Sequence, residues 1–170
     1  MKLDFSVDGK QLSLNVNSNK PLHLILMEEV NLESMDSVCT DGMCGNCIVL
    51  MNSEAVVSCL IPAFRLKGAK IETIESYQKS RFYLDVERAY EDTGSRPCPR
   101  CYAAKTLIFE SLLQSMFKKD PGSLEEEELD EQLIVREVGL SRCPCLDAHE
   151  MIAIFRSAAT YRRRRRVRRY

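Results

Sequence analysis

The sequence predicts an α+β fold in which a small mixed β-sheet comes first and a group of helices follows. Up to about residue 77, short runs alternate between polar and apolar side chains and are separated by turn residues, which is typical of strands. From Ser80 onward, apolar residues recur every three or four positions, which is typical of helices. A chain of 170 residues, 45% hydrophobic and 29% charged, can bury a modest core of this kind.

The first predicted element is a β-hairpin. Residues 2–7 and 11–16 alternate in polarity, and Asp8-Gly9 between them is a hairpin turn signal. After a short loop, Pro21 suits the first turn of a helix because it needs no backbone N–H there. This short helix is predicted to run to about Val30.

A second hairpin and a closing strand complete the predicted sheet. Residues 48–51 and 55–57 form the hairpin around a turn at Asn52-Ser53, and residues 70–74 alternate once more. One helix packed across a mixed sheet of this size is a β-grasp arrangement. We assign it to residues 1–77.

Four helices are predicted after the sheet. Gly94 ends the first and Asp120-Pro-Gly122 ends the second. Ser123 and Glu126 form a capping box for the third, which runs through Val138. The apolar residues that mark the first, second and fourth helices are, in order, Phe82, Val86, Ala89, Ile108, Leu112, Met116, Phe117, Met151, Ile152 and Phe155.

A loop with three thiols at the spacing C-x4-C-x2-C precedes the second hairpin, and a fourth thiol follows eleven residues later. These cysteines are Cys39, Cys44, Cys47 and Cys59. The spacing is the plant-type [2Fe–2S] pattern. Gly42 and Gly45 lie where a side chain would resist a positive φ, and they leave backbone N–H groups free to point at the sulfurs. Zinc, a disulfide and buried free thiols are the alternatives, but structural zinc usually takes two short cysteine pairs, so we interpret the loop as an iron–sulfur site.

The other four cysteines form two short pairs, each at a predicted helix start. They are Cys98, Cys101, Cys143 and Cys145. If the two helix starts meet, the pairs create one four-thiolate site, and helix N-termini offer N–H groups and a positive dipole end to such an anion. C-x2-C with C-x-C can also hold zinc, so the spacing leaves zinc and an iron–sulfur cluster open.

The order of all eight cysteines resembles the iron–sulfur subunit of the molybdenum hydroxylases, which include xanthine dehydrogenase, aldehyde oxidase and carbon monoxide dehydrogenase. The resemblance runs from Met1 to about Ala159 and includes Ser58-Cys59-Leu60 and the strand Ile71–Ile74. It implies that the first four cysteines hold a [2Fe–2S] cluster in a ferredoxin-like β-grasp domain. It likewise implies that the second four hold another [2Fe–2S] cluster in a four-helix domain, residues 78–160.

The resemblance also implies a function in electron transfer within a molybdenum-dependent oxidoreductase. In this family a molybdopterin-bearing large subunit hydroxylates the substrate, and electrons pass through the helical-domain cluster and then the β-grasp cluster, usually to FAD on a third subunit. The chain shows no nucleotide signature such as G-x-G-x-x-G. We therefore expect molybdopterin and FAD on partner subunits only, and no catalytic centre for substrate on this chain.

The neighbours of the second cysteine set depart from the family pattern. Pro97 stands where the family usually has a glutamine that contacts the pterin, and Cys101 is followed by Tyr102-Ala103-Ala104 in place of Thr-Pro-Gly. The ligands themselves are kept, so these changes bear on the partner and the substrate. They leave open a mixed case, in which the first cluster carries electrons and the second site serves another partner.

The last ten residues, 161–170, form an arginine-rich tail. Residues 162–170 contain seven arginines, and because the whole chain has a net charge of −1, the rest carries −8. A negatively charged chain of this kind is poorly suited to general nucleic-acid binding, because nucleic acid is itself negatively charged. We interpret the tail as a frayed, solvated end of the last helix or as a contact with a partner subunit. The alternative function is a zinc-stabilised adaptor that binds nucleic acid through this tail.

The remaining features indicate a cytoplasmic protein without a membrane span. There is no apolar run long enough to cross a bilayer, and the chain begins as a strand without a signal-peptide core. In that compartment cysteines are ligands more often than disulfides. We interpret His23 and His149 as ordinary surface or capping residues, and the acidic run Glu125–Glu128 as a solvated helix face.

Overall fold

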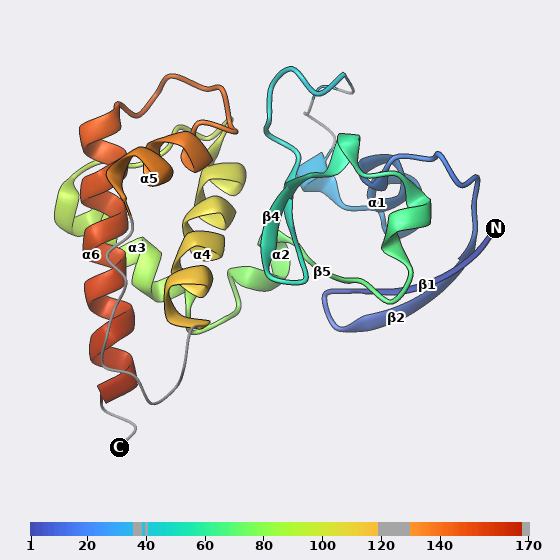
Figure 1. Ribbon diagram of the computed structural model, residues 1–170, viewed down its shortest axis with the longest axis horizontal. Coiled ribbons are helices and arrows are strands. Elements are labelled where there is room, and N and C mark those ends of the chain that lie inside the picture. The colour runs from blue at the N-terminus through green and yellow to red at the C-terminus, as the bar shows by residue number, and fades with distance from the viewer. Residues whose placement is uncertain (36–38, 40, 119–129, 168–170) are drawn as a thin grey trace.

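The computed structural model describes residues 1–35, 39, 41–118 and 130–167. It confirms an α+β fold: a five-stranded mixed sheet occupies the right half of Figure 1 and a group of helices the left. The strand order is β2-β1-β5-β3-β4. The two halves lie side by side, with β3, β4 and α4 at the boundary between them.

The first hairpin is confirmed. Strand β1 (Lys2–Val7) pairs antiparallel with β2 (Lys10–Asn15). The predicted turn residues Asp8 and Gly9 have φ values of 51° and 79°. Positive φ at both turn positions matches the right-handed twist of the flanking strands, which is why Asp-Gly is favoured there.

Helix α1 (Leu22–Val30) follows Pro21 as predicted and covers one face of the sheet. Its buried face consists of Leu22, His23, Ile25 and Leu26. The prediction for His23 is wrong: the ring is 1% exposed, and neither nitrogen has a hydrogen-bond partner in the protein. Burial lowers the pKa of His23 because it disfavours the charged ring.

The second hairpin and the closing strand are also confirmed. Strand β3 (Ile48–Met51) pairs antiparallel with β4 (Glu54–Val57). Strand β5 (Lys70–Glu72) lies parallel to β1 and antiparallel to β3, which makes the sheet mixed. Three short 3₁₀ helices complete this half, at Glu33–Met35, Ser58–Leu60 and Ala63–Leu66.

Strand β3 is buried on both faces. Val49 packs into the core under α1, whereas Ile48 and Leu50 pack into the core formed by the helices. Because successive side chains of a strand point to opposite faces, one strand contributes to both cores. The short helix α2 (Ile74–Tyr77) adds Ile74 and Tyr77 to the helical core. The sheet is therefore covered by α1 on one face and by the helical half on the other.

Four helices follow α2 in the described part of the chain. They are α3 (Tyr83–Thr93), α4 (Tyr102–Lys118), α5 (Glu131–Val138) and α6 (Ala148–Val167). Gly94 ends α3 in the left-handed conformation, as predicted. The predicted capping box of Ser123 and Glu126 lies outside the described residues, as does Glu125–Glu128. Helix α5 begins later than predicted because Asp130 caps it, accepting a hydrogen bond from the N–H of Gln132.

The arginine tail does not begin as a frayed end. Helix α6 continues to Val167, and Arg162 is 5% exposed. Its guanidinium donates to Asp85 at 2.7 Å and to Glu110 at 2.6 Å. Glu110 also accepts from the hydroxyl of Tyr77 at 2.6 Å, so the network joins α2, α3, α4 and α6. The described part of the tail is thus anchored in the helical core.

None of the described helices is both long and apolar enough to cross a membrane.

We predict that Arg162→Met destabilises the protein by about 3–5 kcal/mol, because it leaves buried Glu110 without its counter-charge and leaves Asp85 with Arg165 alone. The matched control is Arg156→Met, also on α6. Arg156 reaches Glu131 at the same 2.6 Å, but these side chains are 58% and 51% exposed, against 6% and 1% for Arg162 and Glu110. The control should cost less than about 1 kcal/mol. Urea unfolding measures the loss in free energy of unfolding for both variants. Equal losses would contradict the anchoring role of the Arg162 network.

Candidate metal centres

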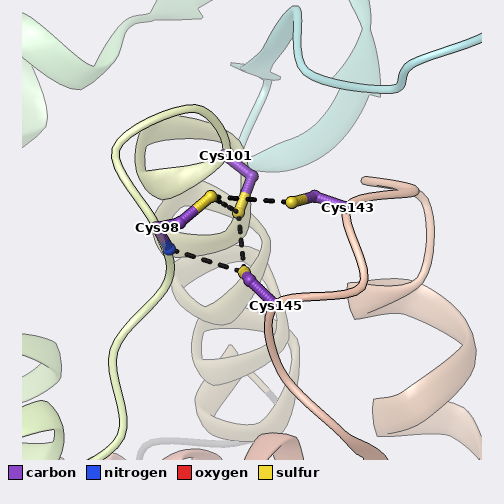
Figure 2. Close-up of side chains that lie close together, drawn as sticks. All are labelled: Cys98, Cys101, Cys143 and Cys145. Atoms are coloured by element: carbon purple, nitrogen blue, oxygen red, sulfur yellow. Dashed lines mark hydrogen bonds between the residues drawn. The ribbon is translucent and has the colours of Figure 1, made fainter.

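Four cysteine side chains converge between α4 and α6 (Figure 2). They are the predicted second set, Cys98, Cys101, Cys143 and Cys145. Their Sγ atoms all lie within 4.8 Å of one another. The closest pairs are Cys98–Cys101 at 3.7 Å, Cys98–Cys143 at 3.6 Å and Cys101–Cys145 at 3.2 Å. All eight cysteines of the chain are free thiols.

The two pairs are positioned by the turns that begin the helices. The N–H of Cys101 donates to the carbonyl of Cys98 at 3.0 Å, which folds the first pair into a turn before α4. Asp147 and Glu150 form a reciprocal capping box at the start of α6, with N–H to carboxylate distances of 2.8 and 2.9 Å. The sequence reasoning missed this box, although D-x-x-E ahead of an apolar run could have revealed it. The cap fixes the start of α6 and therefore the position of Cys145.

The environment sets the thiols apart in acidity. Hydrogen bonds from the backbone at Cys101, and then from the Cys143 side chain, lower the pKa of Cys98 to about 7. Burial raises the pKa values of Cys101 and Cys143. The N–H of Cys98 points at the sulfur of Cys145 at 3.4 Å, a donor that stabilises negative charge on that sulfur. Hydrogen bonds thus favour the thiolate form of Cys98, whereas burial disfavours that form at Cys101 and Cys143.

The sulfur spacing fits a four-thiolate metal centre. With metal–sulfur bonds of about 2.3 Å, the edges of a sulfur tetrahedron are roughly 3.8 Å long. The observed pairs, at 3.2 to 3.7 Å, are close to that length. A single zinc or iron ion takes such a donor set directly, whereas a [2Fe–2S] core, with one thiolate pair on each iron, would hold the two pairs farther apart. The thiol geometry by itself therefore leaves the choice of metal open.

Three cysteines of the first set, Cys39, Cys44 and Cys47, lie in the predicted loop before β3, and Cys59 lies in the 3₁₀ helix that follows β4. Cys44 donates its N–H to the sulfur of Cys39 at 3.2 Å, and Cys59 donates to the sulfur of Cys47 at 3.4 Å. The loop therefore aims backbone donors at sulfur, as predicted. Burial, followed by a hydrogen bond with Cys47, raises the pKa of Cys59 to about 12. Among the described residues these four sulfurs do not form as tight a group as the second set.

Both glycines of this loop have the predicted backbone. Gly42 has a φ of 78° and Gly45 a φ of 66°. Gly45 has a second role that the sequence did not reveal: a Cβ on it would lie 1.7 Å from the carbonyl oxygen of Leu140. The loop is in direct contact there with the segment that leads to Cys143.

Two hydrogen bonds hold this contact together. The N–H of Arg142 donates to the carbonyl of Cys44 at 3.1 Å, and the hydroxyl of Ser141 donates to Asn46 at 2.8 Å. Arg142 is the residue before Cys143, so a single hydrogen bond joins a cysteine of the first set to the neighbour of a cysteine of the second. The fold thus brings together two cysteine sets that lie far apart in sequence.

Other residues singled out from the sequence play smaller parts here. His149 is exposed at the start of α6, in agreement with a surface residue. Pro97 is buried directly before Cys98. Lys105 was not singled out, yet it is fully buried one turn after Cys101. A lysine among apolar helix positions carries no sequence signal for burial, because lysines usually occupy solvated faces.

No family model matches the chain. It is 27% identical to one of the subunits of nicotinate dehydrogenase from Pseudomonas putida over 162 residues, which cover 95% of this chain and 97% of that protein. It is 31% identical to the xanthine dehydrogenase iron-sulfur-binding subunit of Escherichia coli O157:H7 over 99 residues, covering 58% of this chain and 62% of that one. The crystal structure of quinoline 2-oxidoreductase from Pseudomonas putida 86 superposes with a TM-score of 0.71 at 23% identity, over 96% of each chain, a likeness of fold.

We predict that Gly45→Ala disrupts the contact between the two loops. The matched control is Gly68→Ala, since Gly68 has a similar φ of 70° but no atom within 4 Å of the position that a Cβ would take. The control should cost about 1–2 kcal/mol for the left-handed backbone alone. Gly45→Ala should cost about 1–3 kcal/mol more, because the clash is with backbone. Equal midpoints in thermal unfolding would contradict the close approach.

Proposed function

We propose that this chain is an electron-transfer subunit that carries two [2Fe–2S] clusters. The proposal starts from its similarity to iron–sulfur subunits of molybdenum hydroxylases. The observation that carries the proposal is the convergence of Cys98, Cys101, Cys143 and Cys145 beside the loop that bears the first cysteine set. The relatives whose names specify iron–sulfur binding favour iron over zinc at these thiols.

The chain's own residues supply ligands, donors and contact between the sites. In this proposal one cluster is held by Cys39, Cys44, Cys47 and Cys59, and the other by Cys98, Cys101, Cys143 and Cys145. Bound clusters supply one-electron redox chemistry. Backbone N–H groups directed at the sulfurs of Cys39, Cys47 and Cys145 stabilise the added negative charge. The hydrogen bond from Arg142 to Cys44 keeps the two sets adjacent.

Electrons would enter at the second set and leave at the first. We propose that a molybdopterin-binding large subunit is the donor, and that an FAD-binding subunit or another acceptor lies at the far side. Two large apolar side chains beside the first set are exposed: Met43 at 60% and Leu60 at 63%. Met43 lies within the cysteine loop and Leu60 follows Cys59. Exposed apolar residues gathered near a redox site suit a subunit contact, so we propose this face for the acceptor.

The proposed domain division places the ferredoxin-like β-grasp domain at residues 1–77 and the helical domain at 78–160. The separate cores under α1 and among α3–α6 support it, although β3 contributes to both. The described part of the 161–170 segment belongs with the helical domain, since Arg162 is buried there. Eight free thiols suit the reducing cytoplasm, where we expect the complex.

We predict that the purified chain contains about four iron and about four acid-labile sulfide atoms, with visible absorption and two EPR signals on reduction. Metal analysis and EPR of the native complex measure this directly. A colourless chain with two zinc ions and no sulfide would instead favour the zinc-stabilised adaptor. Salt-sensitive RNA binding that is lost on deleting residues 162–170 would then show that the tail binds nucleic acid, as that alternative requires.

We further predict that Cys44→Ser and Cys98→Ser each remove or distort one EPR signal, and not the same one. Each variant should keep about two irons, because the other four thiols are untouched. Each serves as the control for the other. In Cys44→Ser, electrons should no longer reach the acceptor, and normal acceptor reduction would mean that the order of the two sites is wrong.

A further inference from the structure

Lys105 is a buried cation without a buried anion beside it. Its side chain is 0% exposed within α4. The ammonium donates to the carbonyl of Ser141 at 3.1 Å and is 3.5 Å from the carbonyl of Val138. In the described part of the chain no carboxylate forms an ion pair with it. Arg162 shows the contrast, since that buried cation has both Asp85 and Glu110 at hydrogen-bond distance.

An uncompensated buried ammonium is costly. Removing it from water costs several kcal/mol, and carbonyl dipoles return only part of that. Buried charges are therefore normally paired with an opposite charge or neutralised. A lysine in this setting indicates that negative charge is present nearby in the working protein.

The four thiols of the second set are the groups that can supply this charge. Lys105 lies in the first turn of α4, four residues after Cys101, which directly precedes the helix. Four residues correspond to about 6 Å along the helix axis and to the same side of the helix. Its backbone N–H donates to the carbonyl of Cys101. Its ammonium reaches Ser141, two residues before Cys143. Lys105 thus bridges the two segments that carry the thiols shown in Figure 2.

We infer that Lys105 is the fixed counter-charge of the second centre and raises its reduction potential. The inference rests on the proposed function, because it takes the second centre to be a [2Fe–2S] cluster with four thiolates. Such a centre carries a charge of about −2 when oxidised and about −3 when reduced. Reduction adds one electron from the donor, and no bond or proton changes place. A nearby buried positive charge stabilises the reduced form more than the oxidised form, since Coulomb energy scales with the charge.

The test is an EPR-monitored redox titration of the full chain with its clusters bound. Lys105→Met removes the charge and keeps an unbranched side chain of similar size. The equilibrium constant for reduction of the second centre should fall at least tenfold, which is 59 mV for a one-electron couple. The equilibrium constant for reduction of the first centre, measured in the same sample, should change less than threefold. Lys105→Arg keeps the charge, so the equilibrium constant for reduction of the second centre should stay within threefold of the value in the original chain.

Lys79→Met is the matched control for net charge. Lys79 is exposed after α2, so water and salt screen its charge and neither centre should respond. A second centre that is present in Lys105→Met with an unchanged potential would overturn the inference, and would show that Lys105 only clamps the carbonyls of Val138 and Ser141.

A further pair of variants decides the case in which Lys105→Met loses the second cluster. Lys105→Gln can still donate a hydrogen bond but is neutral, whereas Lys105→Arg is charged. If Lys105→Gln loses the second cluster and Lys105→Arg keeps it, the result supports Lys105 as the counter-charge. Loss in both, or retention in both at the same potential, overturns it. An original chain without iron would defeat the proposed function itself, whereas an unchanged potential defeats only the role of Lys105.

Discussion

The contact between the cysteine loop and the segment before Cys143 is the constraint on which the arrangement of this protein depends. It needs a residue without a side chain at Gly45, because the carbonyl oxygen of Leu140 occupies the space of a Cβ. The hydrogen bond from the N–H of Arg142 to the carbonyl of Cys44 then fixes the distance between the loop and the segment before Cys143. In the proposed function the two cysteine sets must lie close together, because electron transfer weakens steeply with separation. Here backbone meets backbone, which is the closest approach that two segments can make.

The two cores serve this contact. Strand β3 starts directly after Cys47 and packs Ile48 and Leu50 against the helical core. Helix α4 starts directly after Cys101 and runs along β3 and β4. Each cysteine set is therefore attached to an element at the boundary of the two halves. Packing across the sheet brings the sites together without a dedicated linker.

Buried charge is treated in two different ways within the helical half. Around Arg162, the Asp85 and Glu110 carboxylates, the Arg165 guanidinium and the Tyr77 hydroxyl complete a network with two positive and two negative charges. Around Lys105, the hydrogen-bond partners among the described residues are the carbonyl oxygens of Val138 and Ser141. Both cations are removed from water, so the two sites differ in how the described residues compensate the charge.

The sequence by itself determined the local structure. Alternating runs and Asp8-Gly9 predicted the first hairpin, and Pro21 predicted the start of α1, because both depend on neighbours within a few residues. The cysteine spacing also predicted which four thiols converge in the second set. Only the tertiary structure decided that Gly45 faces Leu140, that His23 is buried, and that Arg162 and Lys105 lie in the core. The reason is physical: a charged or polar side chain is placed by the partners that surround it, and those partners come from segments distant in the chain. Local pattern cannot carry that information, whereas packing of the two halves does.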